Sequence, residues 1–234
     1  MASKIVLLDV DGVLFTHRPL MNIVRNKIAV YTQKYLETHR NIKMTDKECC
    51  LFVDNLYRRT GHTMRGMWQY YGADKHLSLR DFNDEVYDSE TLRLLGAHLK
   101  YNANVQEQRE TAQYFVSKCE AANIPVGIFS NAPQQWCDMI VSNYGLNVDP
   151  KLLYTSSHPL FHPRRVKPDT SLYNDISDAC TNAKEIIFID DSSMNIKGAT
   201  NVRKWKPIEY TSPDSFYDIA FEHLSVGFGT SYTA

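Results

Sequence analysis

The sequence predicts an α/β fold, with a mostly parallel sheet and a second, helical region inserted after the first strand. Three short apolar runs, Ile5–Leu8, Ile124–Phe129 and Ile186–Ile189, are rich in β-branched or aromatic residues and show no polar alternation. Continuous hydrophobicity is typical of strands that are covered on both faces, as in a parallel sheet. Helical patterns separate the three runs, and this alternation of strand and helix favours an open α/β sheet.

The helices of the sheet region follow from periodicity and from end signals. Pro133–Tyr144, for example, has proline at its start and Gly145 just past its end, the asymmetry expected of a helix. The helices expected in this region are Gln106–Ala122, Pro133–Tyr144, Asp169–Ala183, Met194–Thr200 and Phe216–Leu224.

The region between the first and second strands breaks the alternation and has a helical pattern throughout. Thr45 and Glu48 have the spacing of a capping box at the start of one of these helices. We therefore expect an α/β core formed by residues 1–15 and 106–234 and a helical domain formed by residues 16–105. The helices expected in this domain are Met21–Thr38, Thr45–Thr60, Met64–Tyr71 and Leu79–Tyr87.

Composition narrows the classes of partner. The chain has 234 residues and a formal net charge of −1, so no basic excess indicates a nucleic-acid polymer as ligand. The cysteine count of five is odd and no CxxC pair occurs, which favours a reducing compartment over a disulfide framework or a zinc site. No apolar stretch is long enough for a signal peptide or a membrane span. We expect a cytoplasmic monomer or homodimer that acts on a small molecule.

Polar side chains follow each of the three predicted strands. In an open α/β sheet, ligands bind beyond the carboxyl ends of the strands, so these side chains are expected to meet in one crevice. Four carboxylates in one crevice repel one another unless a cation lies among them, and oxygen ligands of this kind suit Mg²⁺. The residues concerned are Asp9, Asp11, Ser130, Asn131, Asp190 and Asp191.

Lys167 is the candidate cation for a phosphate group in this crevice. It precedes Pro168, which favours an extended conformation for Lys167 and begins the next helix. Each motif also has a purely structural explanation. Lys167 could be an exposed lysine, the first two aspartates a turn, Ser130 a cap for the helix that follows, and Asp190 with Asp191 a cap for the helix after them. The ordered convergence of all four motifs favours a functional site.

The segments DVDGVLF, FSNAP, KPD and FIDDSSMN resemble, in this order, the four motifs of the haloacid dehalogenase superfamily of phosphohydrolases. The resemblance covers about residues 1–15 and 106–210 and implies a Rossmann-like core. The helical region after the first strand resembles the C1-type helical cap of subfamily I, which closes over the active site.

The resemblance implies a role for each motif residue. Asp9 would be the nucleophile that forms an aspartyl-phosphate, and Asp11 the general acid and then the general base. Dehalogenases of the superfamily lack this second aspartate, so Asp11 argues for phosphate chemistry. The residues implied to bind phosphate are Ser130, Asn131 and Lys167. The implied Mg²⁺ ligands are Asp9, the backbone carbonyl of Asp11, and Asp191. Asp190 would either bind the ion directly or support these ligands from behind. Asn195 would orient a loop or Lys167.

The stretch from residue 56 to residue 72 is rich in aromatic and arginine residues, and its pattern YxxxGxxxRGM resembles the pyrimidine 5′-nucleotidase branch. The resemblance implies a Mg²⁺-dependent phosphatase of nucleoside 5′-monophosphates. The side chains expected to set substrate specificity are His62, Arg65, Trp68 and Tyr71. The same pattern would arise if the aromatic residues formed the core of the helical domain and the arginines were solvated. The alternatives are a phosphatase of phosphoglycolate or sugar phosphates, a phosphomutase, and a non-catalytic regulatory protein.

Overall fold

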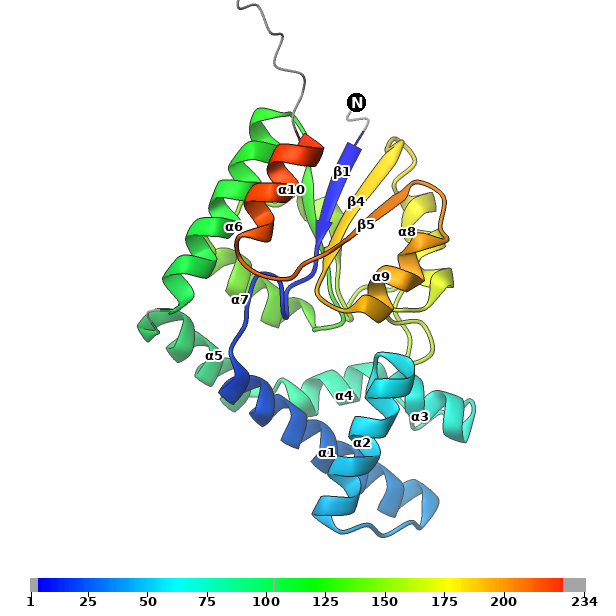
Figure 1. Cartoon of the computed structure of the whole chain (residues 1–234). Helices are drawn as coiled ribbons and strands as arrows, with labels where there is room; N and C mark the ends of the chain where they lie inside the picture. The colour runs from blue at the N-terminus through cyan, green and yellow to red at the C-terminus, as the bar shows by residue number, and fades with distance from the viewer. Residues whose placement is uncertain (1–3, 103, 225–234) are drawn as a thin grey trace, which may run out of the picture.

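The structure is a computed structural model that describes residues 4–102 and 104–224. Residues 1–3 and 225–234 of the expected core lie outside this range. A five-stranded parallel sheet with the order β3-β2-β1-β4-β5 forms its centre. The α/β class and the parallel sheet predicted from the sequence are therefore confirmed (Figure 1). The strands are β1 (Lys4–Leu8), β2 (Val126–Phe129), β3 (Leu153–Tyr154), β4 (Glu185–Asp190) and β5 (Trp205–Glu209).

The central strand β1 fixes where the polar motifs meet. Leu8, its last residue, pairs with Ile128 of β2 on one side and with Ile189 of β4 on the other. The three strands therefore end at the same level, and the polar residues that follow each of them come to one edge of the sheet.

Two strands were not predicted from the sequence, and both lie at the edges of the sheet. The edge strand β3 has only two residues, which is too short to give a hydrophobic pattern. The opposite edge strand, β5, contains Pro207 and exposed polar residues, and proline counts against a strand in the interior of a sheet. Proline is tolerated in β5 because this strand has a neighbour on one side only.

Helices cover both faces of the sheet. Helices α6, α7 and α10 lie on one face, and α8 and α9 lie on the other (Figure 1). On the first face, the rings of Phe115 and Phe216 stack with their centroids 4.8 Å apart, which joins α6 to α10. The bounds of these helices are α6 (Asn104–Ala121), α7 (Gln134–Tyr144), α8 (Thr170–Ala179), α9 (Ser193–Thr200) and α10 (Ser215–Leu224).

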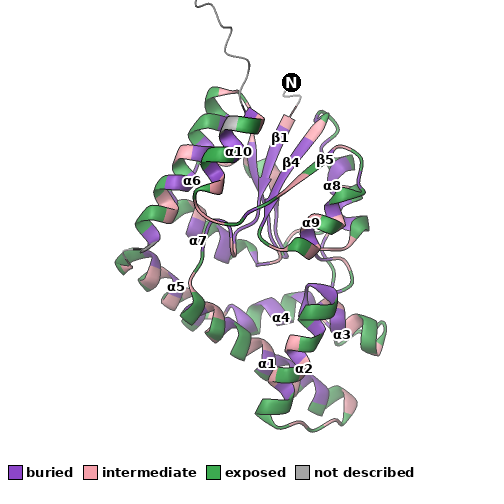
Figure 2. Ribbon diagram, in the orientation of Figure 1, coloured by how far each residue is buried: buried purple, intermediate pink, exposed green. Residues whose placement is uncertain are grey.

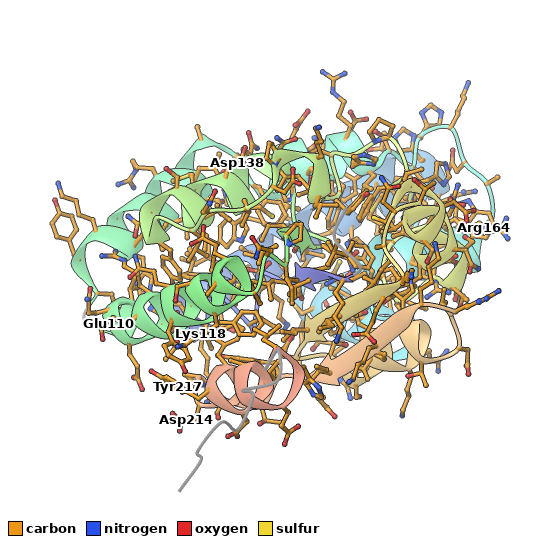
Figure 3. All side chains as sticks on the ribbon, turned by 90° about the horizontal axis from the view of Figure 1, so that it is seen from above. Glu110, Lys118, Asp138, Arg164, Asp214 and Tyr217 are labelled. Carbon is orange, nitrogen blue, oxygen red and sulfur yellow. The ribbon has the colours of Figure 1, made fainter. Side chains whose placement is uncertain are left out.

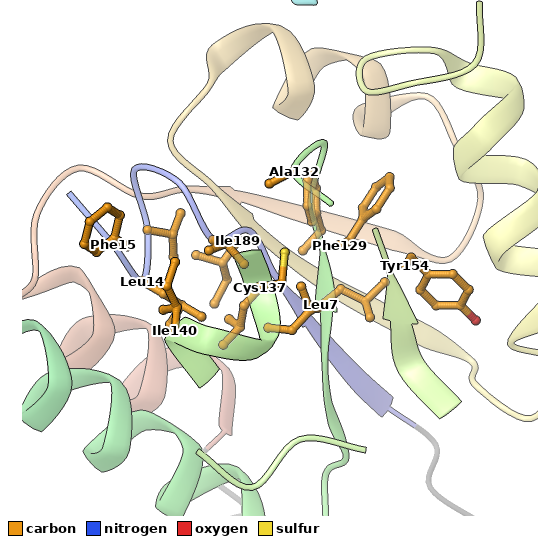
Figure 4. Close-up of a cluster of buried hydrophobic side chains, with 14 of the residues drawn as sticks. Leu7, Leu14, Phe15, Phe129, Ala132, Cys137, Ile140, Tyr154 and Ile189 are labelled. Atoms are coloured by element: carbon orange, nitrogen blue, oxygen red, sulfur yellow. The ribbon is translucent and has the colours of Figure 1, made fainter. Parts of the chain in front are cut away.

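The hydrophobic core lies between the sheet and these helices. Leu7 of β1 and Ile189 of β4 pack near Cys137 and Ile140 of α7, and all four side chains are almost fully buried (Figure 4). Figure 2 shows the central strands β1 and β4 as almost continuously buried. Burial on both faces explains why the sequence of these strands is uninterrupted in its hydrophobicity.

Five helices between β1 and α6, here called the helical insertion, lie beyond the carboxyl ends of the strands (Figure 1). The capping box predicted at Thr45 and Glu48 is present at the start of α2. Helix α5 was not predicted, although Asp88 caps it by accepting a hydrogen bond from the backbone of Thr91. The helices are α1 (Arg18–Arg40), α2 (Asp46–Thr60), α3 (Thr63–Tyr71), α4 (Leu79–Val86) and α5 (Ser89–Tyr101).

The helical insertion packs directly on the core beside Lys167. A Cβ added to Gly61, the residue that ends α2, would lie 2.6 Å from Cδ of Pro168. Only glycine permits so close an approach. A second contact joins Asn83 of α4 to Ser156, whose hydroxyl accepts a 2.9 Å hydrogen bond from Nδ2 of the asparagine.

Charged side chains lie around the outside of the molecule, where Figure 3 labels Glu110, Lys118, Asp138, Arg164 and Asp214. None of the helices in the described residues is long and apolar enough to cross a membrane. All five cysteines are free thiols, as the absence of a disulfide pattern predicted.

Candidate functional site

A cavity of about 320 Å³ lies between the carboxyl ends of the strands and the helical insertion. Nearly every motif residue singled out in the sequence lines it, so the folded chain brings these motifs together. The motif residues in its lining are Asp9, Asp11, Ser130, Asn131, Lys167, Asp191 and Asn195. Asp190 lies directly behind them, fully buried.

Lys167 is the electrostatic centre of the site. Its Nζ lies 2.9 Å from Oδ1 of Asp9 and 2.6 Å from Oδ2 of Asp190, and only 1% of its side chain is exposed. Burial alone would lower the pKa of Lys167, but the carboxylates of Asp190 and Asp9 outweigh burial and raise it. The lysine is therefore a buried, paired cation, and the alternative interpretation of Lys167 as an exposed lysine is wrong.

The backbone of Lys167 is held by the side chain of Asn131. Oδ1 of Asn131 accepts a hydrogen bond from the amide of Lys167 at 2.9 Å, and Nδ2 donates to its carbonyl at 3.1 Å. Asn131 follows β2 and Lys167 precedes α8, so this pair of bonds ties two motifs together.

Asp190 has donors on both carboxylate oxygens. Oδ1 accepts from the backbone of Ser192 at 2.8 Å and from Nδ2 of Asn195 at 2.9 Å. Oδ2 accepts from Lys167 and, at 3.0 Å, from the same amide of Asn195. Asn195 thus orients Asp190, which in turn holds the ammonium group of Lys167.

Asp9 and Asp11 both face the cavity, although β1 ends at Leu8. Oδ1 of Asp9 accepts a 2.7 Å hydrogen bond from the backbone of Val10, in addition to its contact with Lys167. Burial raises the pKa of Asp11 to about 6. An indole also holds the Asp11 carboxylate, because Nε1 of Trp136 donates to its Oδ1 at 2.9 Å.

A cation site fits among three of the carboxylates. One oxygen each from Asp9, Asp190 and Asp191 lies within 4.8 Å of the others. Burial first, and then the charge of Asp190, raises the pKa of Asp191, and burial likewise raises the pKa of Asp9, so a cation here would relieve an unfavourable charge. A Cβ on Gly12 would lie 2.2 Å from Oδ2 of Asp191, so glycine keeps this carboxylate free. The donor set is all oxygen and suits Mg²⁺.

Ser130 does not cap the following helix. Its hydroxyl accepts a 3.2 Å hydrogen bond from the backbone of Ala132, whereas Pro133 stands at the cap position of α7 without a side-chain bond. Ser130 is buried and lines the cavity.

His62 alone among the four expected specificity residues lines the cavity. It caps α3, where its Nδ1 accepts a 3.2 Å hydrogen bond from the backbone of Met64. Burial, followed by the positive charges of Arg65 and Lys167, lowers the pKa of His62 to about 4. The ring is thus a neutral group near neutral pH.

The other three expected specificity residues lie outside the cavity lining. Nη2 of Arg65 is 3.4 Å from Oδ2 of Asp169 in the core. Trp68 lies under the guanidinium of Arg164, with 5.0 Å from Cζ to the ring centroid. Tyr71 lies under the guanidinium of Arg40 at the same distance. A direct contact of these three side chains with substrate stays a prediction.

Several lining residues were not predicted from the sequence. They come from the helical insertion and form an apolar wall with a few polar groups, and no local motif marks them because they meet only through tertiary packing. They are His17, Arg18, Met21, Val24, Ile28, Phe82 and Tyr87. Tyr57, the first residue of the pattern YxxxGxxxRGM, also lines the cavity. The bond from Trp136 to Asp11 was missed for the same reason, since the two residues are 125 positions apart.

Comparisons with known proteins agree with this geometry. The chain matches the haloacid dehalogenase-like hydrolase family over residues 3–203. A search of curated proteins found no match.

Solved structures of low sequence identity resemble this chain, and the first two that follow share its fold. A HAD hydrolase of family IA, variant 3, from Entamoeba histolytica is 17% identical, with a TM-score of 0.50 over 88% of this chain and 83% of that one. CbbY from Rhodobacter sphaeroides in complex with phosphate is 10% identical, with a TM-score of 0.50 over 90% of this chain and 88% of that one. L-2-haloacid dehalogenase from Xanthobacter autotrophicus is 13% identical, with a TM-score of 0.45 over 96% and 85%.

At these identities the structural likeness concerns the fold alone. The family match carries the assignment, because it spans more than half of the chain and includes all four polar motifs. The chain therefore belongs to the haloacid dehalogenase-like hydrolases.

Proposed function

We propose that this hydrolase is a Mg²⁺-dependent phosphomonoesterase that works through a phosphorylated Asp9. The observation that carries the proposal is the paired ammonium of Lys167, 2.9 Å from Asp9, with a second carboxylate, Asp11, facing the same cavity. A phosphoryl group needs a nucleophile, a cation for its oxygens and a proton source for the leaving oxygen. The site supplies one residue for each task.

In the first half-reaction, the Asp9 carboxylate attacks phosphorus and forms an acyl phosphate. Oδ1 of Asp9 is held by the backbone of Val10 and by Lys167, so Oδ2 is the oxygen left to attack. The bond from phosphorus to the ester oxygen breaks, its electron pair stays on that oxygen, and Asp11 supplies the proton. Lys167 and the Ser130 hydroxyl stabilise the charge on the phosphoryl oxygens.

In the second half-reaction, Asp11 is a carboxylate and acts as the base. It takes a proton from a water molecule, whose oxygen attacks phosphorus. The bond between phosphorus and Oδ2 of Asp9 breaks, which releases inorganic phosphate and restores the carboxylate of Asp9.

In this proposal the carboxylates of Asp9 and Asp191 and the backbone carbonyl of Asp11 would hold Mg²⁺. Bound Mg²⁺ would neutralise part of the charge on the phosphoryl oxygens. Asp190 has donors on both oxygens, so it serves chiefly to hold Lys167 and stands behind the ion.

The proposed substrate is a nucleoside 5′-monophosphate. In this proposal residues 16–105 are a cap over a core of residues 1–15 and 106–234, and the cavity between them holds the leaving group. Tyr57, Phe82 and Tyr87 line its wall, and aromatic rings of this kind stack on the faces of bases. Arg18, also in the lining, can donate to a polar edge of the base or the sugar.

A substrate screen tests the proposal. Phosphate release is measured with Mg²⁺ and with a chelator across nucleoside monophosphates, phosphoglycolate and sugar phosphates, and chloride release is measured with 2-chloropropionate. We expect Mg²⁺-dependent phosphate release that is fastest with a nucleotide. Faster release from phosphoglycolate or a sugar phosphate would reassign the substrate. Chloride release without phosphate release would contradict the proposal.

A further inference from the structure

One indole holds the carboxylate of Asp11. Within residues 4–102 and 104–224, the bond from Nε1 of Trp136 to Oδ1 is the one hydrogen bond that reaches this carboxylate, and Oδ2 has no protein partner. We infer that Trp136 is a positioning residue that aims Oδ2 of Asp11 at the leaving oxygen of the substrate. The inference rests on the proposed function, in which Asp11 is the general acid.

The indole is itself rigidly held. Trp136 lies in the first turn of α7 and is fully buried. Its ring packs edge-on against Phe15, with centroids 5.9 Å apart at 84°, and against Tyr87, with centroids 5.2 Å apart at 69°. Aromatic rings in this geometry attract one another and have few alternative rotamers. The donor is therefore fixed before substrate arrives.

One of these two rings belongs to the helical insertion. Tyr87 ends α4, and its carbonyl accepts a 3.3 Å hydrogen bond from Nε2 of Gln135, the neighbour of Trp136. The indole is thus clamped between the core and the insertion. The insertion therefore helps to hold the indole that bonds to Asp11.

The chemistry at this carboxylate is a single proton transfer. As the bond from phosphorus to the ester oxygen breaks, that oxygen keeps the electron pair and takes the proton from Oδ2 of Asp11, which becomes a carboxylate. The Trp136 N–H stays bonded to Oδ1 throughout. A carboxyl group free to rotate would present Oδ2 for a smaller fraction of the time, which slows this transfer.

The role of a proton donor is measured by how strongly the rate depends on the leaving group. Phenyl phosphate and 4-nitrophenyl phosphate have nearly the same shape, but phenolate is the more basic leaving group and needs the proton more. We compare kcat/KM for the two esters, because this constant reports formation of the phosphorylated enzyme. General acids contribute about 10²- to 10⁴-fold to such steps.

Trp136→Phe keeps an aromatic ring and removes the N–H. We expect its kcat/KM to fall about tenfold more for phenyl phosphate than for 4-nitrophenyl phosphate, with a larger difference of the same kind in Asp11→Asn. Trp205→Phe is the matched control, because Trp205 is also buried and its indole donates to Ser177 Oγ at 2.6 Å. We expect Trp205→Phe to change kcat/KM for both esters by the same factor.

Each outcome decides a separate point. An equal loss on both esters in Trp136→Phe, with a selective loss in Asp11→Asn, overturns the inference and leaves the proposed function standing. Equal losses in both variants, or no phosphate release by the wild-type protein, overturn both. If Trp136→Phe does not fold, 3-benzothienylalanine at position 136 keeps the bicyclic shape and exchanges the N–H for sulfur, and the same selective loss is expected of it.

Discussion

The ammonium of Lys167 lies 2.9 Å from the carboxylate of Asp9, and both side chains are buried. A charge pair in this setting is held by its surroundings, since Asn131 fixes the lysine backbone and Asp190 takes a second bond from the ammonium. Removing one member of a buried pair leaves the other uncompensated, which costs more free energy than the pair contributes.

Lys167→Met should therefore destabilise the fold as well as remove activity. We expect the free energy of unfolding to fall by about 3 kcal/mol, because Asp9 and Asp190 lose their counter-charge. Urea unfolding in the presence of a chelator measures it. The double variant Lys167→Met/Asp190→Asn should recover part of the loss. No recovery would show that the lysine acts through its packing and not through its charge.

Gly12→Ala should weaken Mg²⁺ binding. Its Cβ would come within 2.2 Å of Oδ2 of Asp191, so this carboxylate must leave the proposed site. Gly72→Ala is a matched control, because Gly72 also has a positive φ, +78° against +91° at Gly12, but has open space around its Cβ position. Both variants carry a backbone cost, because both glycines have a φ that L side chains rarely adopt. Calorimetric titration should show Mg²⁺ affinity reduced about tenfold or more in Gly12→Ala alone. Equal affinities would remove Asp191 from the metal site.

Arg65→Ala should lower kcat/KM by the same factor for nucleotides and for small phosphate esters. Arg65 contacts Asp169, two residues after Lys167, and does not line the cavity. A double-mutant cycle with Asp169→Asn, which keeps a capping oxygen for α8, should give a coupling energy of about 0.5 kcal/mol. A loss confined to nucleotides would instead support the substrate contact predicted from the sequence.

His62 should make the fold sensitive to mild acid. Its pKa is lowered from the ordinary 6.5 to about 4, so the neutral ring stabilises the native state fully above pH 6.5. This stabilisation is lost as the pH falls toward 4, by about 3 kcal/mol in total. Unfolding measured across this range should show a shallower acid dependence in His62→Gln than in the wild-type protein.

His162→Gln is the control for this experiment. His162 also accepts a backbone hydrogen bond on Nδ1, from Arg164 at 3.3 Å, but it is exposed. If the two variants behave alike, burial of His62 is not the cause of the dependence.

The sequence predicted the parts of the site that are local in the chain. Three of the polar motifs stand at the ends of buried strands, so the strand ends were enough to assemble them. Lys167 stands before α8 and not at a strand end, so it was predicted from the order of the motifs. Helix ends with clear capping signals, such as Thr45, were also predicted.

The missed features depend on packing between distant segments. Nothing near Trp136 indicates that its indole reaches Asp11, and nothing near Arg65 indicates Asp169 as its partner. The edge strand β5 was missed because Pro207 and exposed residues hide it, and its place is set by pairing with β4. Such relationships appear only when the chain is folded.

The central claim is that phosphate passes through Asp9. The most direct test is rapid quenching of the enzyme with Mg²⁺ and a ³²P-labelled nucleoside 5′-monophosphate, followed by peptide mapping. We expect acid-stable label on the peptide that contains Asp9, and neither label nor turnover in folded Asp9→Asn. Label on another residue, or continued hydrolysis by Asp9→Asn, would contradict the account.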